Sequence, residues 1–353
     1  MYDKILFTGD FFFDYNTIPD DISRIGNWIR ENKFKTIMNL EGSISDPDPQ
    51  YAIEKRGPNL ASSQAAALVL KELNTVGVSL ANNHMMDYGE YGLKSTLSVL
   101  DKNDIKHTGA GLTLDEALIP FTIDTGNIKT GVLAFGWDVE ETRYASEKSA
   151  GCAPRKKDII VKAVSDAKEY CDRVVVCMHW GFEFNRYPMP YDTDLAHSLI
   201  DAGADLIIGS HPHCVQPYEV YKGKTIYYSL GNFYFGSKRG MFTKKFNEKI
   251  ANQPDYGIIV IYDPVSEKTD TRLIVYSRKE NESAISDTGK EDILYPLPAL
   301  SEKEYYKSAY KARNNSTPML TANDKINEFL IRKLYTVYSI KKAVRKLIPK
   351  RLS

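Results

Sequence analysis

The sequence lacks any apolar run long enough to cross a lipid bilayer, and its first residues carry neither the apolar core nor the cleavage site of a secretory signal. Only Met-Tyr-Asp precedes the first predicted strand, Lys4–Asp10. Either a targeting segment is missing from this chain or the protein is cytoplasmic, and we expect a cytoplasmic protein. Cysteine is also scarce, with four residues and no Cys-x-x-Cys pair. This pattern indicates reduced, buried thiols rather than a disulfide framework.

The sequence has no net charge, because 46 Lys and Arg residues balance 46 Asp and Glu residues. No global field therefore favours nucleic acid as a partner. The balance is uneven along the chain, since Phe329–Ser353 holds eight Lys or Arg and no acid. The sequence shows no internal repeat and no low-complexity segment. With 353 residues, 42% of them hydrophobic, the chain can bury one large core or two smaller ones.

Predicted strands alternate with predicted helices, which is typical of an α/β fold with a roughly parallel sheet. In the first half, strands are predicted at Lys4–Asp10, Lys35–Leu40, Val76–Leu80, Ile119–Ile123 and Lys129–Phe135, and helices at Asp20–Asn32, Ser62–Leu73 and Glu90–Lys102. In the second half, strands are predicted at Arg173–Cys177 and Asp205–Ile208, helices at Asp158–Tyr170 and Asp192–Asp201, and strand pairs at Val215–Val220 with Thr225–Leu230 and at Gly257–Tyr262 with Thr271–Tyr276.

The chain is predicted to divide into three parts. Residues 1–280 form the α/β domain, and residues 281–300 form a loose polar loop, with Asn281–Asp292 its most turn-rich stretch. Residues 301–353 form a basic helical extension with helices at Ser301–Arg313 and Asn323–Leu347.

Five predicted strands end in residues of the types that bind metal ions. These residues are Asp10, Glu41, Asn83 with His84, His179, and His211 with His213. Because the carboxyl ends of parallel strands meet at one edge of a sheet, we expect the side chains to converge there. Carboxylate, amide and imidazole together suit two adjacent ions of Mn, Fe or Zn better than Ca or Mg. In the alternative interpretation, Asp10 and Glu41 cap helices, and His179 is a core histidine.

The last of these strand ends is the most distinctive. Asp205–Ile208 is a short run rich in β-branched residues, and His211 and His213 follow it with Pro212 between them. Proline fixes its own φ and disfavours helix in the residue before it, so we expect the two imidazoles to be held apart on an extended segment. Taken alone, a His-x-His pair on a loop can also arise by chance.

Seven motifs appear in order along the chain. They are Gly9-Asp10, Asn39-Leu40-Glu41, Leu80-Ala81-Asn82-Asn83-His84 with Asp87-Tyr88-Gly89, Gly109-Ala110-Gly111, His179-Trp180-Gly181-Phe182-Glu183, Gly209-Ser210-His211-Pro212-His213 and Ser229-Leu230-Gly231-Asn232-Phe233. Through them the sequence closely resembles the bacterial capsule-synthesis CapA family, also called poly-γ-glutamate synthesis proteins, which is similar to the calcineurin-like metallophosphoesterases. The resemblance covers about Ile5–Phe235. It implies a four-layer αββα sandwich with a metal centre at the strand ends.

The resemblance also implies roles for individual residues. Asp10, Glu41 and His213 would hold one divalent ion, with Glu41 bridging, and Asn83, His179 and His211 would hold the second. His84 would be the catalytic residue, which protonates a leaving oxygen or steadies the transition state. Substrate contacts would come from Glu183, Asn232 and Arg56, whose guanidinium suits phosphate or carboxylate.

The sequence departs from the metallophosphoesterase pattern at two positions. Phe12 stands where those enzymes have a histidine ligand, so the first metal site is short of a ligand. Ile44 stands where they have the aspartate that orients the catalytic histidine, and Asp87 is a possible substitute for it.

Two functions therefore stay open. The first is a metal-dependent hydrolase or transferase acting on a capsule or polyglutamate precursor, which the intact Asn83-His84 pair favours. The second is a non-catalytic component of a membrane-associated capsule assembly complex, which Phe12 and Ile44 favour.

The basic segment Phe329–Ser353 outlines a helix with one mostly apolar face, which Pro349 ends. Two interpretations are open for it. The helix packs back on the body with its Lys and Arg solvated, or it attaches to an anionic membrane surface at the inner face of the membrane, beside polymer-synthesis proteins.

Overall fold

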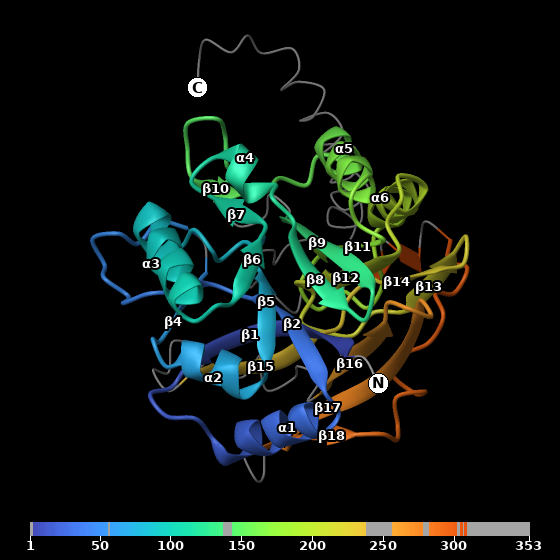
Figure 1. The fold of residues 1–353 in the computed structure, drawn as a ribbon, viewed down its shortest axis with the longest axis horizontal. Coiled ribbons are helices and arrows are strands. Elements are labelled where there is room, and N and C mark those ends of the chain that lie inside the picture. Colours follow the sequence, from blue (N-terminus) through green and yellow to red (C-terminus); the bar gives the residue numbers. More distant parts are fainter. Residues whose placement is uncertain are drawn as a thin grey trace.

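The computed structural model describes residues 3–55, 57–136, 143–237, 256–277, 282–301, 304–305 and 307–308. Its architecture is two β-sheets stacked face to face, with helices on their outer faces (Figure 1). The predicted α/β class and four-layer αββα sandwich are confirmed. The predicted basic extension over residues 301–353 lies almost wholly outside the described residues, and Arg56 lies outside them too.

The larger sheet has eight strands in the order β18-β17-β16-β1-β2-β5-β6, with β15 pairing β1 as well. Their bounds are β1 Lys4–Asp14, β2 Phe34–Leu40, β5 Thr75–Ser79, β6 Lys106–Thr108, β15 Asn232–Ser237, β16 Tyr256–Asp263, β17 Lys268–Ser277 and β18 Glu282–Ser286. The neighbours β1, β2, β5 and β6 run parallel, whereas β16, β17 and β18 add antiparallel strands beyond β1.

The second sheet has six strands in the order β13-β14-β12-β11-β9-β8. Their bounds are β8 Phe121–Thr125, β9 Ile128–Gly136, β11 Arg173–His179, β12 Leu206–Ser210, β13 Tyr218–Tyr221 and β14 Lys224–Tyr227. Two short pairs stand apart from the sheets, β3 Ser43–Ile44 with β4 Ala61–Ser62, and β7 Ala110–Gly111 with β10 Gly151–Cys152. The helices are α1 Asp20–Glu31, α2 Ala66–Glu72, α3 Gly89–Lys102, α4 Leu114–Ala117, α5 Lys157–Lys168 and α6 Pro190–Asp201.

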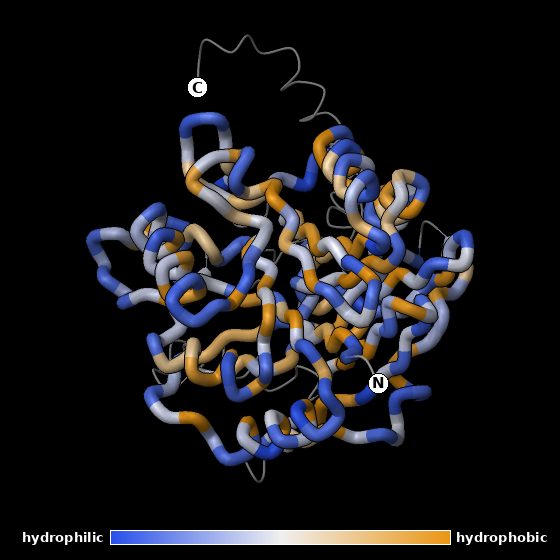
Figure 2. Tube along the Cα trace, in the orientation of Figure 1, coloured by the Kyte–Doolittle hydropathy of each residue, from blue (hydrophilic) through white to orange (hydrophobic). Residues whose placement is uncertain are grey.

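Three apolar clusters separate the four layers, and Figure 2 shows hydrophobic residues gathered along the inner strands. Between the sheets lie alternate side chains of facing strands, such as Phe7 and Val175. The outer face of the larger sheet packs against α1, α2 and α3, where the helical spacing of Ile22, Ile25 and Ile29 places all three against the sheet. The outer face of the second sheet packs against α5 and α6. This burial on both sides explains the nearly continuous apolar runs in the central strands.

Three predicted elements differ most from the structure. The helix predicted from Ser62 begins only at Ala66, because Ala61–Ser62 pairs with β3. The predicted loose loop Asn281–Asp292 contains strand β18, which pairs antiparallel with β17. The polar composition of β18 gave no strand signal in the sequence. It is an edge strand, and its Ser283 N–H donates to the buried Asp21 carboxylate at 2.8 Å. The first strand was predicted to end at Asp10 but continues to Asp14, beyond a shift in register.

The buried carboxylate of Asp205 joins helix α5 and strand β14 by hydrogen bonds. Asp205 accepts hydrogen bonds from Lys168 on α5 at 2.7 Å and from Lys224 on β14 at 2.8 Å. Burial alone would raise the pKa of Asp205, but these hydrogen bonds outweigh it and the pKa lies below its ordinary value. A carboxyl whose folded-state pKa is depressed contributes stability above its unfolded pKa, and that stability is lost as the pH falls through the folded value.

We therefore expect Asp205→Asn to lower the free energy of unfolding at pH 7 by about 1.5–3 kcal/mol, the usual range for hydrogen bonds to charged groups. The difference from wild type should shrink as the pH falls below about 3.9, where the unfolded carboxyl is protonated. Urea denaturation at pH 7 and pH 3 measures both values. An equal difference at the two pH values would show that the charge of Asp205 does not contribute.

Candidate metal centre

Asp10 reaches the centre from an irregular point in β1. Its N–H donates to Gly231 O at 3.0 Å, and the register shifts on both sides of it. Only glycine fits at position 9, directly before Asp10, because a Cβ on that residue would lie 1.8 Å from Gly231 O. In the sheet, Asp10 is paired with Asn39 on β2 and with Asn232 on β15. The Asn39 amide donates to Asp10 Oδ1 at 2.8 Å, so the neighbouring strand holds the carboxylate in place.

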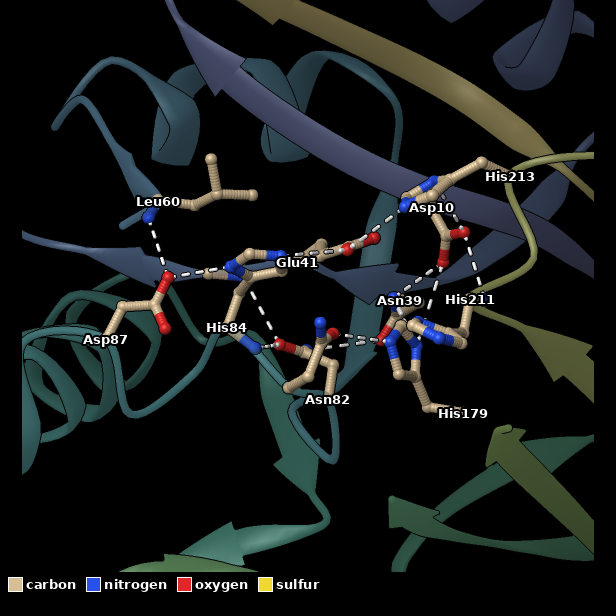
Figure 3. A network of polar contacts seen from close by, with 12 residues as sticks. Asp10, Asn39, Glu41, Leu60, Asn82, His84, Asp87, His179, His211 and His213 are labelled. Atoms are coloured by element: carbon tan, nitrogen blue, oxygen red, sulfur yellow. Dashed lines mark hydrogen bonds and ion pairs between the residues drawn. The ribbon is translucent and has the colours of Figure 1, made fainter. Parts of the chain in front are cut away.

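Three side chains form the first half of the centre. Asp10, Glu41 and His213 each offer a ligand atom, and these atoms all lie within 4.8 Å of one another. His213 lies between the two carboxylates, with Nδ1 at 3.4 Å from Asp10 Oδ2 and Nε2 at 3.6 Å from Glu41 Oε1 (Figure 3). Glu41 follows β2 directly, as predicted from the sequence. Two carboxylates and one imidazole thus share one small buried volume.

The second half lies beside the first. His179, the last residue of β11, places Nε2 at 2.9 Å from Asn83 Oδ1. Its Nδ1 lies 3.0 Å from Ser210 Oγ. The ring of His211 lies 4.7 Å from that of His179. The backbone N–H of His211 donates to Asp10 Oδ2 at 3.1 Å. The contacts with Asp10 join the two halves into one centre.

The strand ends that meet here belong to two sheets. Asp10, Glu41 and Asn83 come from the larger sheet and its loops, whereas His179, His211 and His213 come from the second sheet. The expectation that all of them end along one edge of one sheet was therefore wrong. Because the sheets stack face to face, their edges come together and close the centre from two sides. None of these six residues exposes more than 7% of its surface.

The loop after β12 also differs from the prediction of an extended segment. His211 has φ 93° and His213 has φ 53°, both in the left-handed region that non-glycine residues rarely adopt. Such strained residues persist only where surrounding contacts hold them, and they gather at functional sites. Pro212 fixes its own backbone, but the centre determines the conformation of its neighbours.

The protonation of the centre suits a cation. Burial, and then the neighbouring histidines, lower the pKa values of His179 and His211 well below the ordinary value, which keeps both rings neutral, the form that binds metals. Burial raises the pKa of Asp10, although His213 and Asn39 oppose the rise. Within the described residues His211 Nδ1 is buried without a hydrogen-bond partner. A bound cation would satisfy that nitrogen and offset the burial of the carboxylates, so the donor set fits a divalent transition metal.

His84 borders the centre on the side of Glu41. Its Nε2 lies 3.8 Å from Glu41 Oε1, while its Nδ1 lies 2.7 Å from Asp87 Oδ2. Asp87 thus makes the contact that Ile44 cannot make, because Ile44 is a buried apolar residue of β3. Burial lowers the pKa of His84, Asp87 opposes this, and Lys55 adds to it.

The three residues predicted to contact substrate have different surroundings. Asn232 Oδ1 lies 2.8 Å from His213 Nδ1, so this side chain touches a candidate ligand. Glu183 is half-buried in a turn after β11. Arg56 is outside the described residues. Phe12, at the position of the missing histidine, is fully buried against Phe235 at 5.3 Å between ring centroids.

Sequence reasoning assigned no role to four residues that support the centre. Asn39 contacts Asp10, and Ser210 contacts His179. Asn82 Oδ1 accepts from the N–H groups of His84 at 3.1 Å and Gly42 at 3.3 Å. Lys55 lies beside Asp87 and His84. Three of them stand inside recognised motifs, so proximity to a candidate ligand could have indicated them, whereas Lys55 carries no such signal.

The fold and the site define a class: an αββα sandwich with a buried centre of carboxylate, imidazole and amide groups where its two sheets meet. The chain belongs to the family described as bacterial capsule synthesis protein PGA_cap, which matches residues 4–237.

Similar proteins are known from several bacteria. PGA biosynthesis protein CapA of Bacillus subtilis (strain 168) is 39% identical over 207 residues, which cover 57% of this chain and 54% of the relative. Capsule biosynthesis protein CapA of Bacillus anthracis is 33% identical over 189 residues, which cover 52% of this chain and 46% of the relative. The chain thus spans about half the length of these relatives. A 5'-nucleotidase precursor from Thermus thermophilus has a similar structure with TM-score 0.48 at 11% identity, covering 90% of this chain and 59% of that one.

Among the described residues, no helix is both long and apolar enough to cross a membrane.

Proposed function

We propose that this chain is a metal-dependent hydrolase or transferase that acts on a precursor in capsule polysaccharide or poly-γ-glutamate biosynthesis. The observation that supports it most directly is the convergence of Asp10, Glu41 and His213 with a second imidazole pair and with His84 in one buried centre. The names of the two CapA relatives support the biosynthetic setting. We propose the precursor as its substrate and polymer-synthesis proteins as its partners.

The donor set supports two divalent ions, Mn, Fe or Zn. Asp10, Glu41 and His213 would hold one, and Asn83, His179 and His211 would hold the other. Bound ions would supply Lewis-acid polarisation of a phosphoryl or carbonyl oxygen. His84 would hold or transfer a proton at Nε2, the nitrogen that faces Glu41, while Asp87 keeps the ring in place through Nδ1.

The second candidate function is a non-catalytic component of a capsule assembly complex. It is favoured by Phe12, which is packed against Phe235 where the resemblance implies a histidine ligand. Phe235 in turn lies 5.2 Å from the His213 ring, edge to face, so aromatic rings occupy that side of the first half. This packing is compatible with metal binding but leaves that half with fewer ligands.

Metal analysis and a hydrolysis assay separate the two functions. Purified protein is analysed for bound transition metals and then incubated with bis(4-nitrophenyl) phosphate and Mn²⁺. Bound metal with hydrolysis that chelation abolishes supports the enzyme. Bound metal without hydrolysis of this diester supports the assembly component, and a protein that binds no transition metal contradicts the site as well.

The basic segment Phe329–Ser353 lies outside the described residues, and its attachment to an anionic membrane surface is a proposal from sequence. We expect full-length protein to sediment with vesicles of anionic lipid at low salt, because each Lys or Arg near the surface contributes about 1 kcal/mol. A version ending at Glu328 should stay in the supernatant. If both versions pellet equally, or neither does, the segment does not bind membranes.

A further inference from the structure

Two main-chain N–H groups hold Asp87, those of Ile53 and Leu60. The Ile53 N–H donates to the Asp87 backbone carbonyl at 2.9 Å. The Leu60 N–H donates to Asp87 Oδ2 at 2.7 Å, and the same oxygen faces His84 Nδ1 (Figure 3). The Asp87 backbone and one carboxylate oxygen are therefore held by main-chain contacts that need no particular side chain.

The other carboxylate oxygen is held by a buried cation. Lys55 Nζ lies 2.7 Å from Asp87 Oδ1 and 3.0 Å from His84 Nδ1. The side chain of Lys55 is 1% exposed and that of Asp87 is 0% exposed. The Lys55 ammonium therefore contacts the carboxylate that supports His84.

We propose that Lys55 is a positioning residue for His84, an inference that rests on the proposed function where it concerns catalysis. An ammonium group has three donors and no acceptor, and against an ionised Asp87 the His84 Nδ1 donates its proton to Oδ2 at 2.7 Å, so Lys55 acts on the ring through the carboxylate. Leu60 on Oδ2 and Lys55 on Oδ1 together restrict the rotation of that carboxylate. The acceptor of Nδ1 is then fixed, and the ring presents Nε2 to Glu41 and the centre.

A purely structural role predicts different behaviour. A buried ion pair that loses one partner leaves an uncompensated charge, which destabilises the fold whether or not a functional group lies beside it. The Lys168–Asp205 pair provides a control away from the centre, with the same residue types and the same 2.7 Å distance, although Lys168 is 35% exposed and Asp205 keeps Lys224 at 2.8 Å. Lys168→Met should lower stability without changing the environment of His84.

The first test measures the ring of His84 without any need for turnover. The chain has six histidines, so ¹⁵N-histidine labelling of zinc-loaded protein gives few signals, and His84→Asn identifies the one in question. We expect the His84 ring signals to shift, split or broaden in Lys55→Met and to stay near wild type in Lys55→Arg and Lys168→Met. If Lys55→Met does not fold, Lys55→Gln replaces it, since its amide keeps one donor without the charge. Unchanged His84 signals in the variant that folds would overturn the proposal.

The second test uses bis(4-nitrophenyl) phosphate with Mn²⁺. We expect Lys55→Met to lower kcat by about 10- to 100-fold, the usual effect of removing a group that orients a functional side chain, with KM nearly unchanged and metal retained. Lys55→Arg should recover most of kcat. A lower melting temperature with unchanged kcat per folded molecule would reduce Lys55 to a structural ion pair. If wild type hydrolyses nothing, the proposed function fails, while the ring signals still decide whether Lys55 positions His84.

Discussion

Replacing His179 and His211 together by alanine is expected to lower the metal content of the purified protein sharply while the fold persists. His179 ends β11 and His211 follows β12, so each side chain is presented by a strand that the apolar clusters hold independently. Their rings lie 4.7 Å apart and point into the polar centre rather than into those clusters. Loss of both imidazoles leaves Asn83 as the remaining candidate ligand of that half. Elemental analysis by mass spectrometry measures the metal per chain.

The matched control is His197→Ala. His197 is a part-exposed histidine of α6 whose Nε2 lies 2.9 Å from Glu219, outside the centre. This variant should keep the metal content of wild type. Circular dichroism and the melting temperature should show a folded protein in both cases. Unchanged stoichiometry in the double variant, or an equal loss in the control, would contradict the assignment of the site.

Replacing His84 by asparagine is expected to lower turnover by about a hundredfold or more while metal stays bound. His84 contacts Glu41 at 3.8 Å through Nε2 but is not one of the three clustered ligand groups, so its removal spares the donor set. The substitution removes the imidazole that would carry a proton and that Asp87 contacts at Nδ1. Initial rates with bis(4-nitrophenyl) phosphate and metal analysis of the same sample measure the two effects separately.

His107→Asn is the control for that substitution, because His107 is also a histidine beside a carboxylate but lies on β6, with Asp101 at 3.5 Å. It should leave both turnover and metal unchanged. A fully active His84→Asn protein would show that the chemistry needs only metal, or that His84 has a structural role. A variant that loses metal in proportion to turnover would place His84 among the ligands.

The sequence departs from the metallophosphoesterase pattern at Ile44 and Phe12, and the two positions have different surroundings. Where the resemblance implies an aspartate at the position of Ile44, Asp87 contacts His84 Nδ1 at 2.7 Å from within the same motif as His84. Where it implies a histidine at the position of Phe12, the ring packs against Phe235. If the proposed function holds, the first departure leaves His84 with a carboxylate partner, and the second leaves one half of the centre with fewer ligands.

The sequence by itself determined most helices and strands of this protein and the residue types that gather at its centre. Apolar spacing was enough to place helices such as α1 and α5, and the apolar runs placed the strands, because both signals are local. The candidate ligands could be found because each stands in a short motif at or soon after the end of a predicted strand. The four-layer arrangement followed from the resemblance that those motifs carry, and the structure confirms it.

Only the tertiary structure decided which groups act together, because those contacts join residues far apart in the chain. Lys55 meets His84 across 29 positions, and Asp205 meets Lys168 across 37. Strand β18 forms because the ladder of β17 and the Asp21 carboxylate satisfy its backbone, which its polar sequence could not reveal. His211 likewise has a left-handed conformation that local sequence did not indicate, and its backbone N–H donates to Asp10 of the larger sheet at 3.1 Å. Hydrogen bonds and burial at a meeting of two sheets are set by distance in space, and local sequence patterns do not encode that distance.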